Sequence, residues 1–190
     1  IVSVDSLGKS NPSDQELAKQ AQSGDLTAFN LLVERYQALL FNISYRLVGD
    51  YETAGDVTQE AFMRAFRRVR QYRGGSMRAW LARIATNCAY DNLRSRKRVA
   101  AVGLDDLVDE DRSAWLVNGS RSPEERVLAI ELSEAINKAV QQLPSDQAAV
   151  LVLIDLNGFS YEEASEALGV SLGTVKSRLS RGRAKVRDFF

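Results

Sequence analysis

Apolar residues recur every three or four positions along most of the chain, which is the period of an α-helix, and no segment alternates as a β-strand does. Capping residues and glycines divide the N-terminal half into four predicted helices, at about residues 13–24, 25–49, 50–74 and 76–98. The third helix is expected to bury one apolar stripe, made of Val57, Ala61, Phe62, Ala65, Phe66 and Val69. The fourth is expected to bury Leu81, Ile84, Ala85 and Cys88.

Helix signals return in the C-terminal half after residues 99–122, an acidic and aperiodic segment that we interpret as a linker. Four more helices are predicted at about residues 123–143, 145–157, 160–169 and 174–190. Residues 1–11 are polar and aperiodic, and we expect them to form a mobile tail. The sequence therefore predicts an all-α chain with two helical domains, 12–98 and 123–190, joined by a flexible linker.

The composition excludes several kinds of site. Among its 190 residues the chain has one cysteine, Cys88, and no histidine, so an intrachain disulfide, a thiolate zinc site and a histidine-based triad are not expected. No apolar run approaches the roughly 20 residues that cross a bilayer, and the start lacks the features of a signal peptide. These features indicate a cytoplasmic protein without membrane insertion or a cofactor.

The net charge is zero, but the charges are unevenly distributed. Residues 64–98 hold eleven basic side chains against one acid, Asp91, and residues 176–187 hold six basic side chains and no acid. Five acids lie between these blocks, at residues 105–111. Basic blocks of this kind favour binding to nucleic acid, because contacts with phosphates release counterions. Each block taken alone could also be an ordinary solvated helix face.

The C-terminal pattern is the most specific signal. A short helix, a turn closed by Gly169 and a second, basic helix form the layout of a helix-turn-helix, whose second helix enters the major groove of DNA. On that second helix Val175, Leu179 and Val186 share one stripe, which is expected to pack on Ala164 and Leu168. The opposite face carries Lys176, Ser177, Ser180 and Arg181, whose side chains can contact bases or phosphates. Ala184 lies on the same face.

Three motifs in this half carry a family resemblance: LP at 143–144, GFSYEE at 158–163 and GTVKSRL at 173–179. They resemble region 4 of extracytoplasmic-function (ECF) sigma factors, which are promoter-recognition subunits of bacterial RNA polymerase. The resemblance implies that this domain binds the minus 35 promoter element through Thr174, Lys176, Ser177, Arg178, Ser180 and Arg181. Two departures from the family pattern are Ala164-Ser165 and Gly182, which affect packing and helix propensity rather than contacts.

The N-terminal half carries a second, independent match. The segment DVTQEAF at 56–62 resembles the region 2 helix of sigma factors that docks on the clamp helices of the polymerase largest subunit. Asp56, Gln59 and Glu60 share one face of that helix, away from the apolar stripe, and the resemblance implies that they bind core polymerase. Two other interpretations remain for these carboxylates, a solvated surface and a metal site, although the following arginines oppose a metal.

The fourth helix would then meet the minus 10 element, where the duplex opens. Asn87, Asp91 and Arg94 lie on one face, and such side chains can read or stack on an unpaired base. The loop RGGSMR at 73–78 matches the family segment that helps to form a pocket for a flipped base. The implied minus 10 residues are Arg73, Arg78, Trp80, Asn87, Tyr90, Asp91 and Arg94. Trp80 could support the melted junction, but a lone Trp on an amphipathic helix is more often a core residue.

The two matches in family order imply a sigma factor that is not itself an enzyme. The implied partners are promoter DNA, core RNA polymerase through its clamp helices and flap, and an anti-sigma factor. One alternative is a conventional helix-turn-helix regulator with a ligand-sensing N-terminal domain, which would bind operator DNA without polymerase. Another is a metal-dependent nuclease built on Asp56 and Glu60, whose cleavage of DNA would need magnesium and fail in Glu60→Gln.

Overall fold

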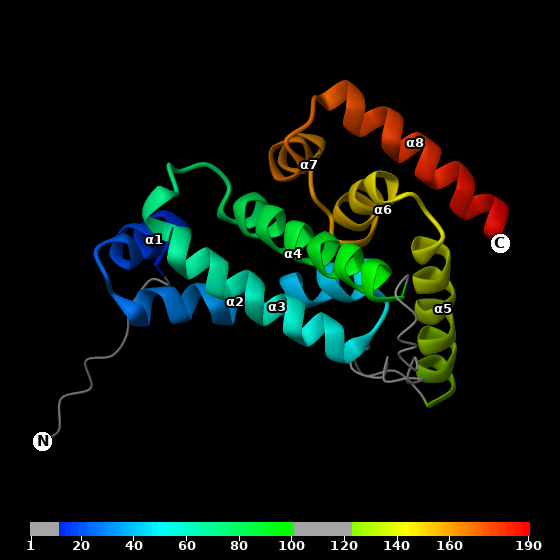
Figure 1. Cartoon of the computed structure of the whole chain (residues 1–190), viewed down its shortest axis with the longest axis horizontal. Coiled ribbons are helices and arrows are strands. Elements are labelled where there is room, and N and C mark those ends of the chain that lie inside the picture. The colour runs from blue at the N-terminus through cyan, green and yellow to red at the C-terminus, as the bar shows by residue number, and fades with distance from the viewer. Residues whose placement is uncertain (1–11, 101–122) are drawn as a thin grey trace, which may run out of the picture.

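A computed structural model describes residues 12–100 and 123–190, with side chains described for 12–98 and 131–190. Every element in these ranges is helical, as Figure 1 shows, which confirms the all-α prediction. The first half holds α1 (Asp14–Gln22), α2 (Leu26–Val48), α3 (Tyr51–Arg68), the 3-10 turn η1 (Val69–Gln71) and α4 (Met77–Ala100). The second half holds α5 (Pro123–Gln141), α6 (Ser145–Leu151), the π-helical turn η3 (Val152–Leu156), α7 (Tyr161–Leu168) and α8 (Leu172–Phe189).

Side-chain caps begin most of these helices where the sequence predicts them. Ser13 and Ser160 form capping boxes with Glu16 and Glu163, and Asp50 accepts the backbone N–H of Thr53 at 2.7 Å. These contacts satisfy backbone donors that a helix N-terminus otherwise leaves unpaired. The tail at 1–11 and most of the linker at 99–122 lie outside the described residues.

Two predicted helix boundaries were wrong. α3 ends at Arg68 rather than at the following glycines, because the chain tightens into η1 and the N–H of Val69 bonds to the carbonyl of Phe66. α8 begins at Leu172 rather than near Thr174, because Ser171 caps it by accepting the N–H of Thr174 at 3.2 Å. The end of α3 and the start of α8 each depend on a single polar contact. The spacing of apolar residues along the chain does not reveal such a contact.

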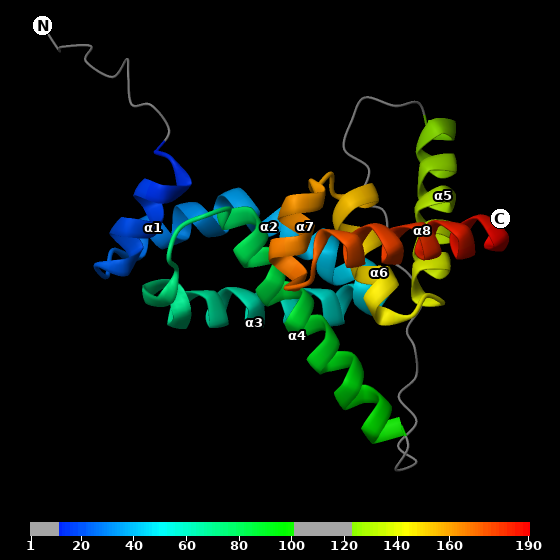
Figure 2. The same ribbon diagram turned by 90° about the horizontal axis from the view of Figure 1, so that it is seen from above.

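One continuous apolar core runs through both halves of the molecule. Its largest fully buried side chains include Leu40, Ile43 and Leu81 from the first half and Leu153 and Leu179 from the second. α7 lies beside α4 in both views, while the C-terminal end of α4 projects away from the other helices (Figure 2). The two halves therefore pack against each other in this conformation.

Polar contacts also join the two halves. The guanidinium of Arg46 donates to the carbonyl of Ser133 at 2.8 Å, and Gln141 donates to the carbonyls of Arg46 and Leu47 at 2.8 and 3.2 Å. These bonds tie α5 to the end of α2. Within the described ranges, no helix is both long enough and apolar enough to cross a membrane.

Cys88 tests the packing of α4. Its side chain is 3% exposed, and burial raises the pKa of the thiol. We expect the native protein at pH 8 to react with an aromatic disulfide reagent on the order of a hundredfold more slowly than the urea-unfolded chain. Absorbance of the released thiolate measures both rates, and equal rates in the two states would contradict this packing.

Candidate functional site

The acidic face of α3 contains residues in two different situations. Asp56 and Gln59 are exposed to solvent. Glu60 instead accepts a hydrogen bond from Nε of Arg64 at 2.7 Å, and Arg64 also donates to Asp91 of α4 at 2.9 Å. These hydrogen bonds raise the pKa of Arg64 further above its usual range. Arg64 therefore links α3 to α4, and Glu60 holds this arginine from within α3.

An apolar groove of about 720 Å³ lies beside this face, between α2 and α3. Its lining includes Gln59 and the exposed side chains of Leu26, Met63 and Phe66, which are 56%, 44% and 46% exposed. The prediction that Phe66 lies in the core was wrong, because its ring packs edge-on against Phe29 at the groove, with centroids 5.0 Å apart. The clue in the sequence is that apolar residues of α3 cover more than one face.

The metal interpretation of the carboxylates gains no support from their geometry. Glu60 is paired with Arg64, whose positive charge opposes a cation at that carboxylate. Across residues 12–98 and 131–190, no three or more acidic, cysteine or histidine side chains converge as a metal site would require.

The loop between η1 and α4 is exposed at Arg73, Gly74 and Gly75. Both glycines have a positive φ, 94° and 93°, which most other residues adopt only with strain. Trp80, one turn into α4, is half-buried, and its ring lies 5.3 Å from that of Tyr72. Trp80 thus supports the loop from inside while part of its ring remains accessible.

The predicted face of α4 is brought together as expected. Asn87, Asp91 and Arg94 are all exposed. Asp91 is held by two arginines, Arg64 at 2.9 Å and Arg94 at 3.3 Å. The carboxylate of Asp91 therefore has a fixed position, with part of its hydrogen-bonding capacity already used.

Two other predicted residues of this half are half-buried and bond to the second half. Arg78 donates to the carbonyls of Asn157 and Gly158, lies 3.9 Å from the ring centre of Phe159 and is 3.5 Å from Glu163. Tyr90 donates its hydroxyl hydrogen to the carbonyl of Ser145. In this arrangement neither side chain can contact DNA unless the second half moves away.

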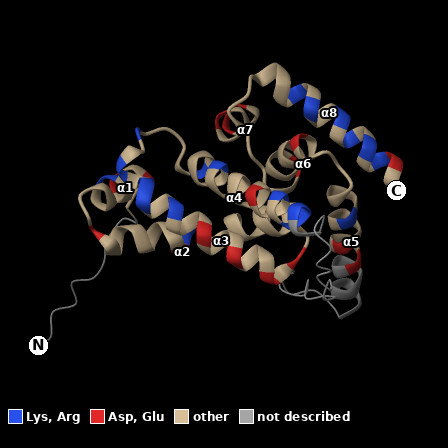
Figure 3. Ribbon diagram, viewed as in Figure 1, with Lys and Arg blue, Asp and Glu red and all other residues tan. Residues whose placement is uncertain are grey.

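Basic residues recur along α8, where blue segments alternate with tan ones in Figure 3. Lys176, Ser177, Ser180 and Arg181 are exposed, whereas Val175 and Leu179 on the opposite side are 0% and 2% exposed. The stripe packs on Ala164, which is itself fully buried, while Leu168 and Val186 lie at its half-buried edge. Thr174 is half-buried at the start of the helix.

Two arginines near this surface are engaged by acids of α6 and η3. Arg178 pairs with Asp146 at 3.1 Å, and Arg183 pairs with Asp155 through two contacts of 2.9 and 2.6 Å. These pairs fix α8 against the helices behind it. Arg178 was predicted as a DNA contact, and its guanidinium would have to serve Asp146 at the same time.

Gly182 supplies a stability prediction. It is buried in the middle of α8, and a Cβ atom there would lie 3.5 and 3.6 Å from the nearest atoms of Gln147 and Leu151, which is ordinary contact. Because alanine is the better helix former, we expect Gly182→Ala to raise the free energy of unfolding by about 1 kcal/mol. Urea denaturation followed by circular dichroism measures this change, and a destabilised variant would show that the packing leaves no room.

Comparisons with known proteins identify the family of the chain. The sigma-70 region 2 family matches residues 32–99, and the sigma-70 region 4 family matches residues 133–186. The chain is 37% identical over 183 residues to the ECF RNA polymerase sigma factor SigE of Mycolicibacterium smegmatis, covering 94% of this chain and 69% of that protein. It is 34% identical over 177 residues to the ECF RNA polymerase sigma-E factor of Escherichia coli, covering 92% of each.

Solved structures share the fold over most of the chain. CnrH in complex with the cytosolic domain of CnrY aligns with a TM-score of 0.66 and 27% identity, over 92% of this chain and 95% of that one. The sigma factor RpoE in complex with the anti-sigma factor NepR, from Bartonella quintana, aligns with a TM-score of 0.67 and 25% identity, over 86% and 97%. The chain thus belongs to the ECF sigma factors of the sigma-70 family, the non-enzymatic subunits that direct RNA polymerase to promoters.

Proposed function

We propose that this sigma factor divides its work among three surfaces. The exposed face of α8 reads the minus 35 element, the 72–78 loop and α4 read and open the minus 10 element, and the acidic face of α3 docks on core polymerase. The observation that carries this proposal is the position of Lys176, Ser177 and Arg181, which are exposed on a helix whose opposite side is buried. The proposed domains are 12–98 and 123–190, with 99–122 as the linker.

Docking on polymerase combines charge with apolar contact. Asp56 and Gln59 are exposed and have no role in holding α3 to α4, so they can pair with basic side chains of the clamp helices. The adjoining groove offers Met63 and Phe66 as apolar anchors of the kind that dominate interface affinity. We propose that the clamp helices cover both the acidic face of α3 and the adjoining groove. The second domain would contact the polymerase flap. This binding would take place in the cytoplasm, where polymerase acts.

Opening the duplex needs no ATP in this scheme. Unpairing and unstacking a base costs a few kcal/mol, which capture of the released base can offset. Arg73 and the exposed glycine loop precede the start of α4, and Asn87 and Arg94 are exposed further along the same helix, which supports a role for both in holding unpaired bases.

The contacts between the two halves support control by an anti-sigma factor. In this arrangement Arg78 and Tyr90, two proposed minus 10 residues, are bound to the second half. The related structures that align over most of the chain are complexes with CnrY and with the anti-sigma factor NepR. We propose that an anti-sigma factor binds this chain and keeps the two halves together until it is removed.

Selection from a randomised promoter library tests the division of work. Core polymerase reconstituted with the chain is given the library in a transcription assay, and the enriched transcripts are sequenced. We expect two enriched sequence blocks upstream of the start site. Lys176→Ala should relax the upstream block, and Asn87→Ala the downstream block.

The conventional regulator makes the opposite forecast for the same library. Such a protein would enrich a symmetric operator in a binding assay without polymerase and would give no transcripts of its own. If only one sequence block is enriched, the surface proposed to read the missing block, on α8 or on α4 and its loop, does not have that role.

A further inference from the structure

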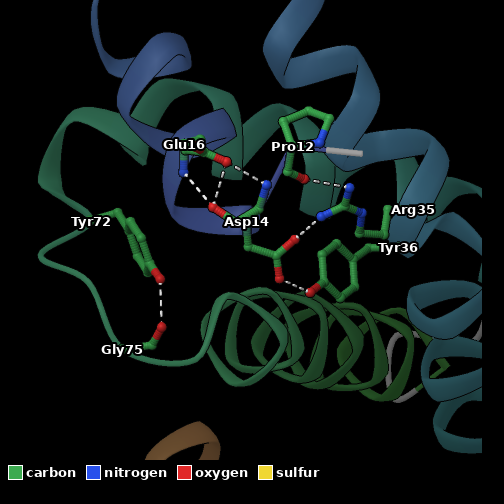
Figure 4. A network of polar contacts seen from close by, with 8 residues as sticks. Pro12, Asp14, Glu16, Arg35, Tyr36, Tyr72 and Gly75 are labelled. Atoms are coloured by element: carbon green, nitrogen blue, oxygen red, sulfur yellow. Dashed lines mark hydrogen bonds and ion pairs between the residues drawn. The ribbon is translucent and has the colours of Figure 1, made fainter. Parts of the chain in front are cut away.

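The loop that we propose holds an unpaired base is short of internal contacts. Its residues Arg73, Gly74 and Gly75 are all exposed, and two of them are glycines at a positive φ. One bond crosses the loop, from the hydroxyl of Tyr72 to the carbonyl of Gly75 at 2.8 Å (Figure 4). A loop of this kind must take its position from its neighbours if it is to recognise a base.

Gln22, the last residue of α1, lies at the base of this loop. Its amide nitrogen donates two hydrogen bonds, to the carbonyl of Val69 at 3.1 Å and to the carbonyl of Tyr72 at 2.7 Å. The two carbonyls belong to the residue that begins η1 and to the residue at which the chain leaves it. Because both partners are acceptors, only a side chain that donates can hold them together.

The other end of α1 is anchored firmly to α2. Asp14 accepts hydrogen bonds from Arg35 and from the hydroxyl of Tyr36, and Arg35 also donates to the carbonyl of Pro12 at 2.9 Å (Figure 4). Leu17 and Ala18 between the two ends are buried. α1 is therefore held at both ends, by α2 at its first residue Asp14 and by the base of the loop at its last residue Gln22.

The hydrogen bond from the Tyr72 hydroxyl to the carbonyl of Gly75 persists at neutral pH. Tyr72 is 7% exposed, and burial, with added effect from Asp14 and Glu166, raises the pKa of its hydroxyl. The hydroxyl therefore remains a donor to Gly75, and Gln22 holds the backbone of the same tyrosine. The position of Tyr72 thus connects Gln22 to the tip of the loop.

We infer that Gln22 is a positioning residue for promoter opening: through Val69 and Tyr72 it sets the loop so that one unpaired minus 10 base is held. The inference rests on the proposed role of the loop. Gln22 contacts neither DNA nor polymerase in this role, and it acts only through the base that the loop holds.

The test uses the full chain in reconstituted holoenzyme, with Gln22→Met, which keeps the size of the side chain but cannot donate, and Gln20→Met as the control. Gln20 is exposed on the same helix and makes no contact with the loop in the bonds described here. Open complexes are measured by permanganate reactivity on the selected promoter and on templates with an abasic site at each unpaired minus 10 position. Core binding and the melting temperature are measured alongside.

We expect Gln22→Met to reduce open complexes on the intact promoter about tenfold, the size expected for two neutral hydrogen bonds, at unchanged core affinity. On one abasic template the reduction should fall below about twofold, because the held base is already missing. A merely structural role would give an equal loss on all templates. That equal loss, or a variant indistinguishable from Gln20→Met, would overturn the inference.

Gly74→Val separates this inference from the proposed function. A Cβ at Gly74 meets no atom within 4 Å, so the substitution strains the loop through its φ of 94° without a clash elsewhere. If Gly74→Val lowers the amount of open complex and Gln22→Met does not, the inferred role of Gln22 is wrong and the proposed role of the loop stands. If neither variant changes them, the proposed role of the loop is wrong as well.

Discussion

Replacing Asp56 and Gln59 together by arginine is expected to lower the affinity for core RNA polymerase at least about a hundredfold, because close charge pairs at an interface are worth several kcal/mol. Both side chains are exposed and neither bonds to the rest of the fold, so the variant should keep its helicity. Fluorescence anisotropy of a labelled chain titrated with core polymerase measures the affinity. Glu60 is left unchanged, since reversing it would also break its pair with Arg64.

The control for this variant is Asp188→Arg, which reverses one acidic side chain as Asp56→Arg does, at an exposed position near the end of α8. Its core affinity should lie within about twofold of the wild-type value, as surface substitutions away from an interface are usually near neutral. Unchanged affinity in the Asp56 and Gln59 variant would show that the polymerase docks on a different surface.

Reversing two charges of α8, in Lys176→Glu with Arg181→Glu, is expected to reduce transcription from a complete promoter about a hundredfold, since both phosphate attraction and base contacts are lost. Both side chains are exposed, and the buried side of the helix is untouched. Core affinity should not change. Run-off transcription at several salt concentrations measures the effect, and the salt dependence of promoter binding should become shallower.

A template that is already unpaired and carries only the minus 10 element separates the two domains in this second test. The α8 variant should bind and transcribe this template as the wild type does, because no minus 35 contact is involved. Lys138→Glu, which reverses a single charge on the exposed side of α5, is the control. An equal loss on both templates would mean that the variant damages more than DNA reading.

Much of the fold could be predicted from local signals. The capping boxes at Ser13 and Ser160 and the left-handed glycines at Gly49 and Gly169 mark helix ends through bonds made within a few residues. The buried face of α8 follows from the spacing of Val175 and Leu179 alone. These features depend on neighbours in the chain, which a sequence displays directly.

Features that depend on distant partners could not be predicted in the same way. Phe66 has the spacing of a core residue, but it packs on Phe29 in the lining of an open groove, so Phe66 remains 46% exposed. Gln22 is an ordinary polar residue in the sequence, and its role depends on carbonyls 47 and 50 positions away. Likewise, nothing near Arg78 in sequence indicates that Phe159 and Glu163 meet it.

The packing of the second half on α4 has a consequence for the order of assembly. It binds Arg78 and Tyr90, yet the described residues that line the groove all belong to α2 and α3. The proposed polymerase surface is therefore accessible while part of the proposed promoter surface is not. The chain can therefore bind polymerase first, at a rate that does not depend on how rarely the two halves separate. The free-energy cost of separating the halves then affects only the binding and opening of the promoter.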